Sequence, residues 1–268
     1  MINISSKAKK IKLGSNTAKG GFNNEKDVVE KFNSWEKSAL AQQWLNEIMS
    51  QKSHHNQVIS YEGISEITEV KARILSGHKT DVEVQITTHG NTKRSNKYTA
   101  NLQVKLVSNK RGFNQIDKRW INKYKELWDF PPLVEELLKK FTGEIKPSGG
   151  TKNPKRMFLT EFCPPDREFL IEWFEKNRRE VVSDILEGRG PHRAEWMLVI
   201  HKDESDSPWI LKPMYEIVQK MGLDGDVKVS PRGSLYIGKI TMQRKGGDGG
   251  RPSANMLQFK INPIDILD

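Results

Sequence analysis

The sequence has few of the residues that build covalent or thiolate-based sites. Cys163 is the only cysteine, which excludes a disulfide within the chain and a cysteine-based zinc site. The six histidines show no HExxH or comparable metal-ligating spacing. No uninterrupted apolar run approaches the ~20 residues that span a bilayer. The opening MINISSKAKKIKLG lacks the apolar core of a secretory signal. We therefore expect a cytoplasmic location.

Positive charge, in contrast, is in excess. The chain has 44 Lys and Arg against 34 Asp and Glu, for a formal net charge of +10. Such a surplus indicates a polyanionic partner, nucleic acid first and an acidic membrane surface second. Residues 1–20 are rich in Lys, Ser, Asn and Gly and are predicted to form a basic N-terminal arm. Apolar residues make up 35%, including seven tryptophans, which favours a folded chain.

The order of the predicted elements is mixed α/β. Helical spacing of apolar residues predicts two helices between Glu25 and Met49, and alternation predicts three strands at 67–75, 81–88 and 100–107. Further predicted elements are helices after about Asn114, from Pro132 and over Pro164–Glu187, a surface loop at 143–156, strands within EWMLVI, SLYIGKITMQ and NMLQFKI, and a helix near Pro213–Met221. We expect a mixed central β-sheet flanked by helices, in one domain over 21–268. Its catalytic part would cover about 21–142 and its DNA-recognition part about 143–268.

The predicted hairpin carries the candidate chemistry. Asp81 begins one strand, and Gln103 and Lys105 lie two apart in the next, so both side chains project to the same face. A carboxylate and neutral oxygens can hold Mg²⁺ against a phosphate, and a nearby lysine can orient water and stabilise negative charge. A polar-x-Lys triplet in a strand also occurs by chance in many proteins, so the spacing alone leaves catalysis and an ordinary strand both open.

Several long stretches resemble the HinPI-like restriction endonucleases, a GCGC-recognising group within the PD-(D/E)XK nuclease superfamily. The stretches are LSGHKTD (75–81), QVKLVSNKRGFNQIDK (103–118), KRMFLTEF (155–162), EKNRREVVSDILEGRG (175–190) and QRKGGDGGRPSANMLQFK (243–260). The resemblance implies a restriction-endonuclease-like fold, Mg²⁺ as cofactor, and Asp81, Gln103 and Lys105 as catalytic residues. Asp81, Gln103 and Val104 would form the metal site, with glutamine replacing the usual acid. Glu25 and Glu30, on the first helix, are candidate outer acids or merely solvated.

The same resemblance implies cleavage of double-stranded DNA after the first G of GCGC. It also implies a cognate methyltransferase without direct contact, no membrane partner, and action as a monomer or homodimer. Candidate phosphate contacts are Lys110 and Arg111, although a basic run is usually a solvated face. The glycine-rich segment 243–260 is either a plain flexible loop or a reader of bases. The full set of candidate DNA-binding residues is Lys110, Arg111, Gln115, Lys118, Arg244, Lys245, Asp248, Asn255, Gln258 and Lys260.

Two alternatives remain open from the sequence. A related nuclease could read a different short palindrome with the same catalytic residues, because only the segment 243–260 and the surroundings of Gln115 would differ. A DNA-binding protein with a decayed nuclease centre would bind tightly without cutting, and the missing acid at Gln103 makes that reading concrete.

Overall fold

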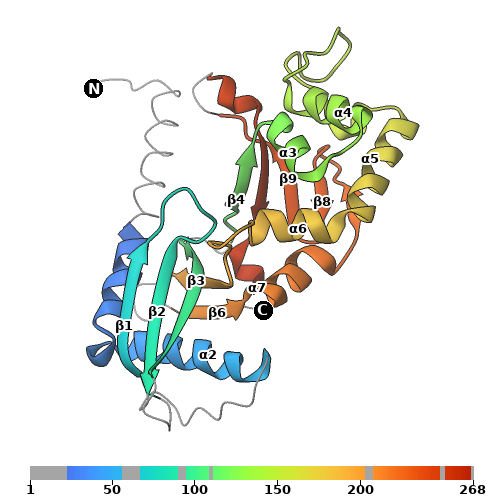
Figure 1. Ribbon diagram of the computed structural model, residues 1–268. Helices are drawn as coiled ribbons and strands as arrows, with labels where there is room; N and C mark the ends of the chain where they lie inside the picture. The colour runs from blue at the N-terminus through green and yellow to red at the C-terminus, as the bar shows by residue number, and fades with distance from the viewer. Residues whose placement is uncertain are drawn as a thin grey trace, which may run out of the picture. The chain divides into compact units, whose positions relative to one another are not determined.

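The computed structural model describes residues 23–55, 67–89, 95–108, 111–202, 208–247 and 251–266. The predicted basic arm at 1–20 lies outside these ranges. The chain divides into two compact units (Figure 1). One, the mixed-sheet unit, comprises Asn16–Asn109 and Glu187–Glu216; the other, the antiparallel unit, comprises Met1–Ser15, Lys110–Leu186 and Ile217–Asp268. The expected division into a catalytic and a recognition part stays a prediction.

A five-stranded sheet forms the centre of the mixed-sheet unit. Its order is β1 (Ile67–Ile74), β2 (Val82–His89), β3 (Ser95–Val107), β5 (Trp196–His201) and β6 (Trp209–Pro213). All neighbours are antiparallel except β3 and β5, which are parallel. The predicted hairpin of β2 and β3 is confirmed, and so is the mixed α/β class with helices beside a mixed sheet.

One face of this sheet is apolar, and the other carries the polar residues of β2 and β3. Figure 1 shows α2 (Ala39–His55) running across β1, β2 and β3, and a 3-10 turn at Trp35–Lys37 links it to the helical residues 23–33. Phe32, Trp44 and Ile48 from these helices are fully buried in one cluster with Val84 and Leu102 of the sheet. Alternation therefore sends the neighbouring residues of β2 and β3 to the opposite face.

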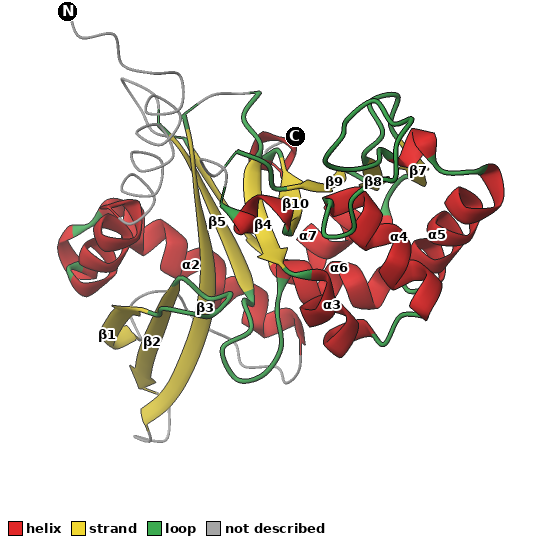
Figure 2. Ribbon diagram, turned by 90° about the horizontal axis from the view of Figure 1, so that it is seen from above, coloured by secondary structure: helices red, strands yellow, loops and turns green. Residues whose placement is uncertain are grey.

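The second sheet belongs to the antiparallel unit. Its order is β4 (Asn114–Arg119), β10 (Leu257–Ile261), β9 (Ile240–Arg244), β8 (Leu235–Ile237) and β7 (Val227–Val229). Figure 2 shows the helices of this unit gathered beside its strands. They are α3 (Ile121–Trp128), α4 (Pro132–Thr142), α5 (Pro164–Lys176) and α6 (Arg178–Leu186). Phe259 of β10 packs edge-on against Tyr124 and Trp128 of α3, which joins sheet and helix in one core.

Short helices complete the described chain. Helix α7 (Met214–Ile217) continues as a π-helix over Val218–Leu223, and 3-10 turns lie at Leu159–Glu161, Pro252–Asn255 and Pro263–Ile266. The helix expected near Pro213–Met221 is present and extends to Leu223. No helix within the described ranges combines the length and the apolar character that crossing a bilayer requires.

Two predicted elements were wrong in detail. The chain after Asn114 forms strand β4 before it turns helical at Ile121, because β4 pairs with β10 far along the sequence. A distant partner of this kind overrides the local pattern. The single long helix expected over Pro164–Glu187 is two helices that meet at Asn177, whose side chain donates to Trp173 O at 2.8 Å. Strands β6 and β7 were not predicted.

Candidate active site

Strands β2 and β3 bring Asp81 beside Gln103. Val82 pairs with Leu102 in the antiparallel register, and the backbone N–H of Asp81 donates to Leu102 O at 2.9 Å. Asp81 therefore lies opposite Gln103, one step beyond that pair. Opposite residues of antiparallel strands share a face, and Lys105 follows Gln103 on the same face of β3.

The Asp81 carboxylate is fixed by β3. Its Oδ2 accepts a hydrogen bond from the backbone N–H of Val104 at 2.8 Å and lies 3.5 Å from Lys105 Nζ. Lys105 Nζ also donates to the carbonyl of Val104 at 3.3 Å. The side chains of Lys105 and Asp81 keep 13% and 24% exposure, so both remain in reach of a ligand. The structure thus brings an acid and an ammonium group together, as predicted.

Gln103 supplies an oxygen that the protein leaves unsatisfied. The residue is 3% exposed, and its Oε1 has no hydrogen-bond partner among the described residues. A buried acceptor without a partner costs about 1–3 kcal/mol, so an occupant that takes this lone pair would be stabilising. A hard divalent cation prefers oxygen donors such as this amide and the carboxylate of Asp81. The donor set therefore fits a divalent metal.

No cluster of three His, Cys, Asp or Glu able to hold a metal occurs in the described part of the chain. Gln103 is not one of these residue types, although its amide oxygen is a possible metal ligand. Glu25 nevertheless interacts electrostatically with both Asp81 and Lys105. Burial raises the pKa of Glu25, the Asp81 charge raises it further, and Lys105 lowers it. Glu30 is exposed on the same helix.

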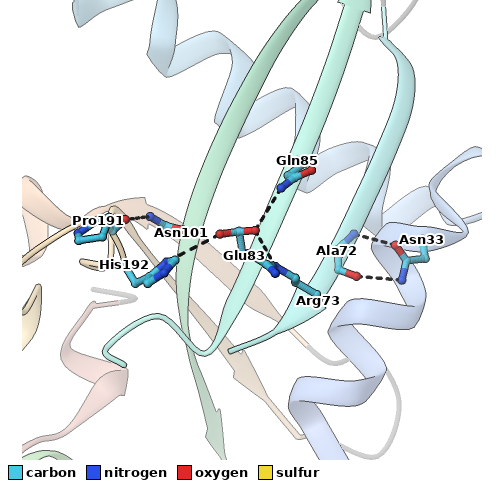
Figure 3. Close-up of polar contacts among 8 residues, drawn as sticks. All are labelled: Asn33, Ala72, Arg73, Glu83, Gln85, Asn101, Pro191 and His192. Carbon is cyan, nitrogen blue, oxygen red and sulfur yellow. Dashed lines mark hydrogen bonds and ion pairs between the residues drawn. The ribbon is translucent and has the colours of Figure 1, made fainter. Parts of the chain in front are cut away.

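A polar network surrounds the same face of the sheet (Figure 3). Glu83 is buried at its centre and accepts from Arg73 Nε at 2.8 Å and from Gln85 Nε2 at 3.2 Å. His192 Nδ1 lies 3.8 Å from the same carboxylate. The bond from Arg73 is the main cause that lowers the pKa of Glu83. No sequence pattern indicates this network, because its members come from three separate segments.

The network also holds the backbone that precedes Asp81. Thr80 is fully buried and its Oγ1 donates to His192 O at 2.8 Å. Asn101 Nδ2 donates to Pro191 O at 3.2 Å, from the strand that also bears Gln103. On the other side, Asn33 exchanges two hydrogen bonds with the backbone of Ala72, at 3.1 and 2.7 Å. These contacts tie the loop around 191–192 and the first helix to the strands of the site.

The family is settled by comparison with known proteins. A family model for the R.HinP1I restriction endonuclease matches residues 59–267. The chain belongs to the R.HinP1I restriction endonuclease family. It is a type II restriction endonuclease, and Asp81, Gln103 and Lys105 lie inside the matched range whereas Glu25 lies outside it.

A solved structure agrees with the fold of this R.HinP1I-family member. It is described as the restriction endonuclease MspI in complex with its cognate DNA. The likeness covers 90% of this chain and 88% of that chain, with a TM-score of 0.61 at 14% sequence identity. At that identity the likeness bears on the fold alone. The comparison with curated proteins finds no match.

The predicted DNA contacts of this endonuclease fall into four groups. Lys110 and Asp248 lie outside the described residues. Arg111 is exposed and Lys245 half-buried; they precede β4 and follow β9. A third group shares one face of the sheet: Gln115 and Lys118 on β4, and Gln258 and Lys260 on β10. Gln258 Nε2 donates to Gln115 Oε1 at 2.8 Å, and burial lowers the pKa of Lys260.

Arg244 and Asn255 stand apart from that group. Arg244 pairs with Leu257 in the register of β9 and β10, so it lies on the face opposite Gln258 and Lys260. Its Nε and Nη2 both donate to Asn255 Oδ1, at 3.2 and 2.6 Å. Arg156 was not among the predicted contacts; burial lowers its pKa, and the charge of Arg244 lowers it further. Its one sequence signal is its place in KRMFLTEF, a stretch that carries the family resemblance.

Proposed function

We propose that this endonuclease hydrolyses phosphodiester bonds of double-stranded DNA at a short palindrome, with Mg²⁺ as cofactor. One observation carries the proposal. The Asp81 carboxylate is clamped to β3 by the N–H of Val104, beside the Lys105 ammonium and next to a buried glutamine oxygen without a partner. Such a trio of acid, neutral oxygen and ammonium suits the hydrolysis of a phosphate diester.

Asp81 and Gln103 would supply the side-chain oxygens for the metal. Val104, the third residue assigned to the metal site, orients the Asp81 carboxylate through its backbone N–H. Glu25 is a further carboxylate near the same groups. A bound Mg²⁺ would reduce the charge on the scissile phosphate and acidify a water molecule. Because Gln103 is uncharged, we expect weaker metal binding than at a site with two carboxylates.

Lys105 would act on the water and on the developing charge. Its Nζ is held by Asp81 and by the Val104 carbonyl, which fixes a positive charge close to the phosphate position. The water oxygen forms a bond to phosphorus, and the bond from phosphorus to the 3′ oxygen breaks. The water loses one proton, and the leaving 3′ oxygen gains one. The products are a 5′-phosphate and a 3′-hydroxyl.

The recognition sequence is proposed from the family resemblance as GCGC, cut after the first G. The similar fold of MspI, solved with its cognate DNA, supports a duplex substrate. We assign catalysis to the mixed-sheet unit and base reading to the polar face of the antiparallel unit. There Gln115, Gln258 and Lys260 offer amide and ammonium groups that can pair with base edges.

The test is digestion of a plasmid of known sequence with Mg²⁺, followed by mapping of the ends. Lys105→Ala should lower the cleavage rate by about 10²–10⁴-fold, the contribution of a group that assists proton transfer and stabilises charge. Lys71→Ala is the matched control, because Lys71 is exposed on the same face of the sheet and pairs with Glu69. It should cut at the wild-type rate.

Each result has a defined meaning. Ends that map to GCGC support the full proposal, and ends at another palindrome overturn GCGC while keeping the catalytic assignment. Random cutting, or no cutting with Mg²⁺, overturns the site-specific activity. Full activity of Lys105→Ala removes this lysine from the mechanism.

A further inference from the structure

Two arginines of the antiparallel unit, Arg156 and Arg244, lie around Gly143, and within the described ranges no carboxylate is bonded to either. A Cβ added to Gly143 would lie 3.4 Å from Arg156 Cβ, and the Gly143 carbonyl accepts from Asn255, which binds Arg244. Arg156 lies in the loop after α4, and Arg244 ends β9. Burial lowers the pKa of both, and the charge of Arg244 lowers that of Arg156 further. The charge of Glu161 acts on Arg156 and raises its pKa. The Glu161 oxygens, however, accept hydrogen bonds from the backbone N–H groups of Lys152 and Phe158 at 2.6 and 2.7 Å. The pair is therefore a half-buried concentration of positive charge.

Aromatic rings hold Arg156 in place. Its guanidinium carbon lies 4.1 Å from the centroid of Phe158 and 5.4 Å from that of Phe141. Rings orient a guanidinium group through its faces and leave its N–H edges available. One of those nitrogens, Nη1, is buried and has no hydrogen-bond partner among the described residues. Arg156 therefore keeps an unsatisfied donor at a fixed position.

A neutral amide holds Arg244. The double hydrogen bond to Asn255 Oδ1 fixes the guanidinium plane, and Asn255 Nδ2 donates in turn to the carbonyl of Gly143 at 3.0 Å. A carboxylate at the position of Asn255 would have fixed the same plane and cancelled its charge. The amide provides the geometry and leaves the charge uncompensated.

We infer that Arg156 and Arg244 together bind one backbone phosphate of the DNA, and that Asn255 is a positioning residue for this site. The inference rests on the proposed function. A phosphate provides both acceptor oxygens for the unpaired N–H groups and the negative charge that offsets two neighbouring cations. The edge of a guanine provides acceptors without that charge. The position of Arg244 opposite Gln258 and Lys260 also separates it from the polar face assigned to base reading.

The experiment measures binding to a set of duplexes that contain the mapped cleavage site, without divalent metal so that the strands stay intact. Each duplex carries one uncharged methylphosphonate linkage at a different position. For the wild type, one linkage should weaken binding about tenfold. Arg156→Gln and Arg244→Gln should each weaken binding to the unmodified duplex by a similar factor and lose sensitivity to that one linkage.

Two further variants and a second set of duplexes make the test specific. Arg232→Gln removes the same charge from an exposed position of the same unit and should keep the wild-type sensitivity at every linkage. Arg156→Lys keeps the charge and should stay sensitive to the critical linkage, which guards against a folding defect in the glutamine variant. Duplexes with single 7-deazaguanine substitutions test a base contact instead, and the arginine variants should respond to them as the wild type does.

The inference is overturned if both glutamine variants keep the wild-type response at every linkage, or if they lose the response to one 7-deazaguanine instead. A wild-type protein that fails to bind the duplex overturns the proposed function and this inference together. Wild-type binding without a shared critical linkage overturns the inference alone.

Discussion

The two units use neutral amide side chains in opposite ways. In the mixed-sheet unit, cations face acids: Arg73 bonds Glu83 and Lys105 lies beside Asp81. There the amide of Gln103 keeps a buried oxygen without a partner in the described chain. In the antiparallel unit, the Asn255 amide accepts a hydrogen bond from Arg244 and donates one to the carbonyl of Gly143. One amide offers an acceptor to an incoming cation, whereas the other orients a cation for an incoming anion.

This difference suggests how one chain can bind both a metal ion and the phosphate backbone of DNA. The carboxylates of the mixed-sheet unit would attract a divalent ion, but alone they would repel DNA. The guanidinium pair of the antiparallel unit would supply attraction, because no acid among the described residues is bonded to either arginine. The substitutions below alter one unit at a time, from the largest expected effect to the smallest.

Asp81→Asn should have the largest effect, and on cleavage alone. The substitution keeps the size of the side chain and removes the only charged oxygen proposed to hold the metal between β2 and β3. We expect cleavage to fall by at least about 10³-fold, since several kcal/mol of charge stabilisation are lost. Binding to duplex DNA without metal should stay equal or become tighter. Asp226→Asn, at an exposed position of the antiparallel unit, is the control, and an active Asp81→Asn enzyme would contradict the assignment.

Gly143→Ala should be the most destabilising of these changes in the antiparallel unit. Gly143 ends α4 with φ at 86°, and an added Cβ would lie 2.2 Å from the carbonyl oxygen of Lys155. We expect a loss of at least about 2 kcal/mol in the free energy of unfolding, from the left-handed backbone and the clash together. Denaturant unfolding measures it.

The control for this prediction is Gly150→Ala. Gly150 has φ at 70° with nothing within 4 Å of an added Cβ, so it should lose only the ~1 kcal/mol of the backbone conformation. Equal losses at the two glycines would refute the close approach of the loop to the end of α4. Gly143→Ala should also weaken DNA binding, because the carbonyl that holds Asn255 would move.

Glu83→Gln tests the acid–cation pairing of the mixed-sheet unit through its pH dependence. The pKa of Glu83 is lowered in the folded chain, chiefly by the hydrogen bond from Arg73. Its contribution to stability is therefore present above the unfolded pKa of about 4.3 and is lost as the pH falls through the folded value. Wild type should exceed the variant by about 1 kcal/mol at pH 7, and the two should converge below about pH 3.

Chemical unfolding at a series of pH values measures this difference. Glu69→Gln is the matched control, because Glu69 pairs with Lys71 on exposed β1 side chains and should change stability by less than about 0.5 kcal/mol. A constant gap between wild type and Glu83→Gln over the whole pH range would show that the glutamic acid stabilises by packing alone.

The sequence predicted the hairpin that carries the proposed catalytic residues far better than its surroundings. Asp81, Gln103 and Lys105 lie on one hairpin, and alternation along adjacent strands is a local property that a sequence pattern contains. Strand β4 was missed because it forms by pairing with β10, which lies more than a hundred residues away. The same holds for Arg156, which meets Arg244 only in the folded unit, and for His192 beside Glu83. Tertiary contacts of this kind leave no trace in periodicity.

Glu25 falls between these cases. Its helix was predicted from the spacing of Val28 and Phe32, which are buried against the sheet, and it was named as a candidate outer acid together with Glu30. Only the structure distinguishes Glu25 from Glu30 as the acid near the site, since the charges of Asp81 and Lys105 shift the pKa of Glu25. A helical pattern gives the face of a residue but not the strand residue that it meets.

Gln103→Glu should give the smallest effect and the sharpest view of how the two units differ. The change adds a second carboxylate to the hairpin site, so we expect Mg²⁺ to bind about threefold more tightly, or ~0.7 kcal/mol, because each ligand charge strengthens attraction for a divalent ion. Calorimetric titration with Mg²⁺ measures this without DNA, and the metal dependence of cleavage gives a second readout. Gln85→Glu adds the same charge on the same face of β2, beside Glu83, and should leave Mg²⁺ affinity nearly unchanged. If Gln103→Glu needs as much metal as the wild type, the buried amide oxygen does not face the ion.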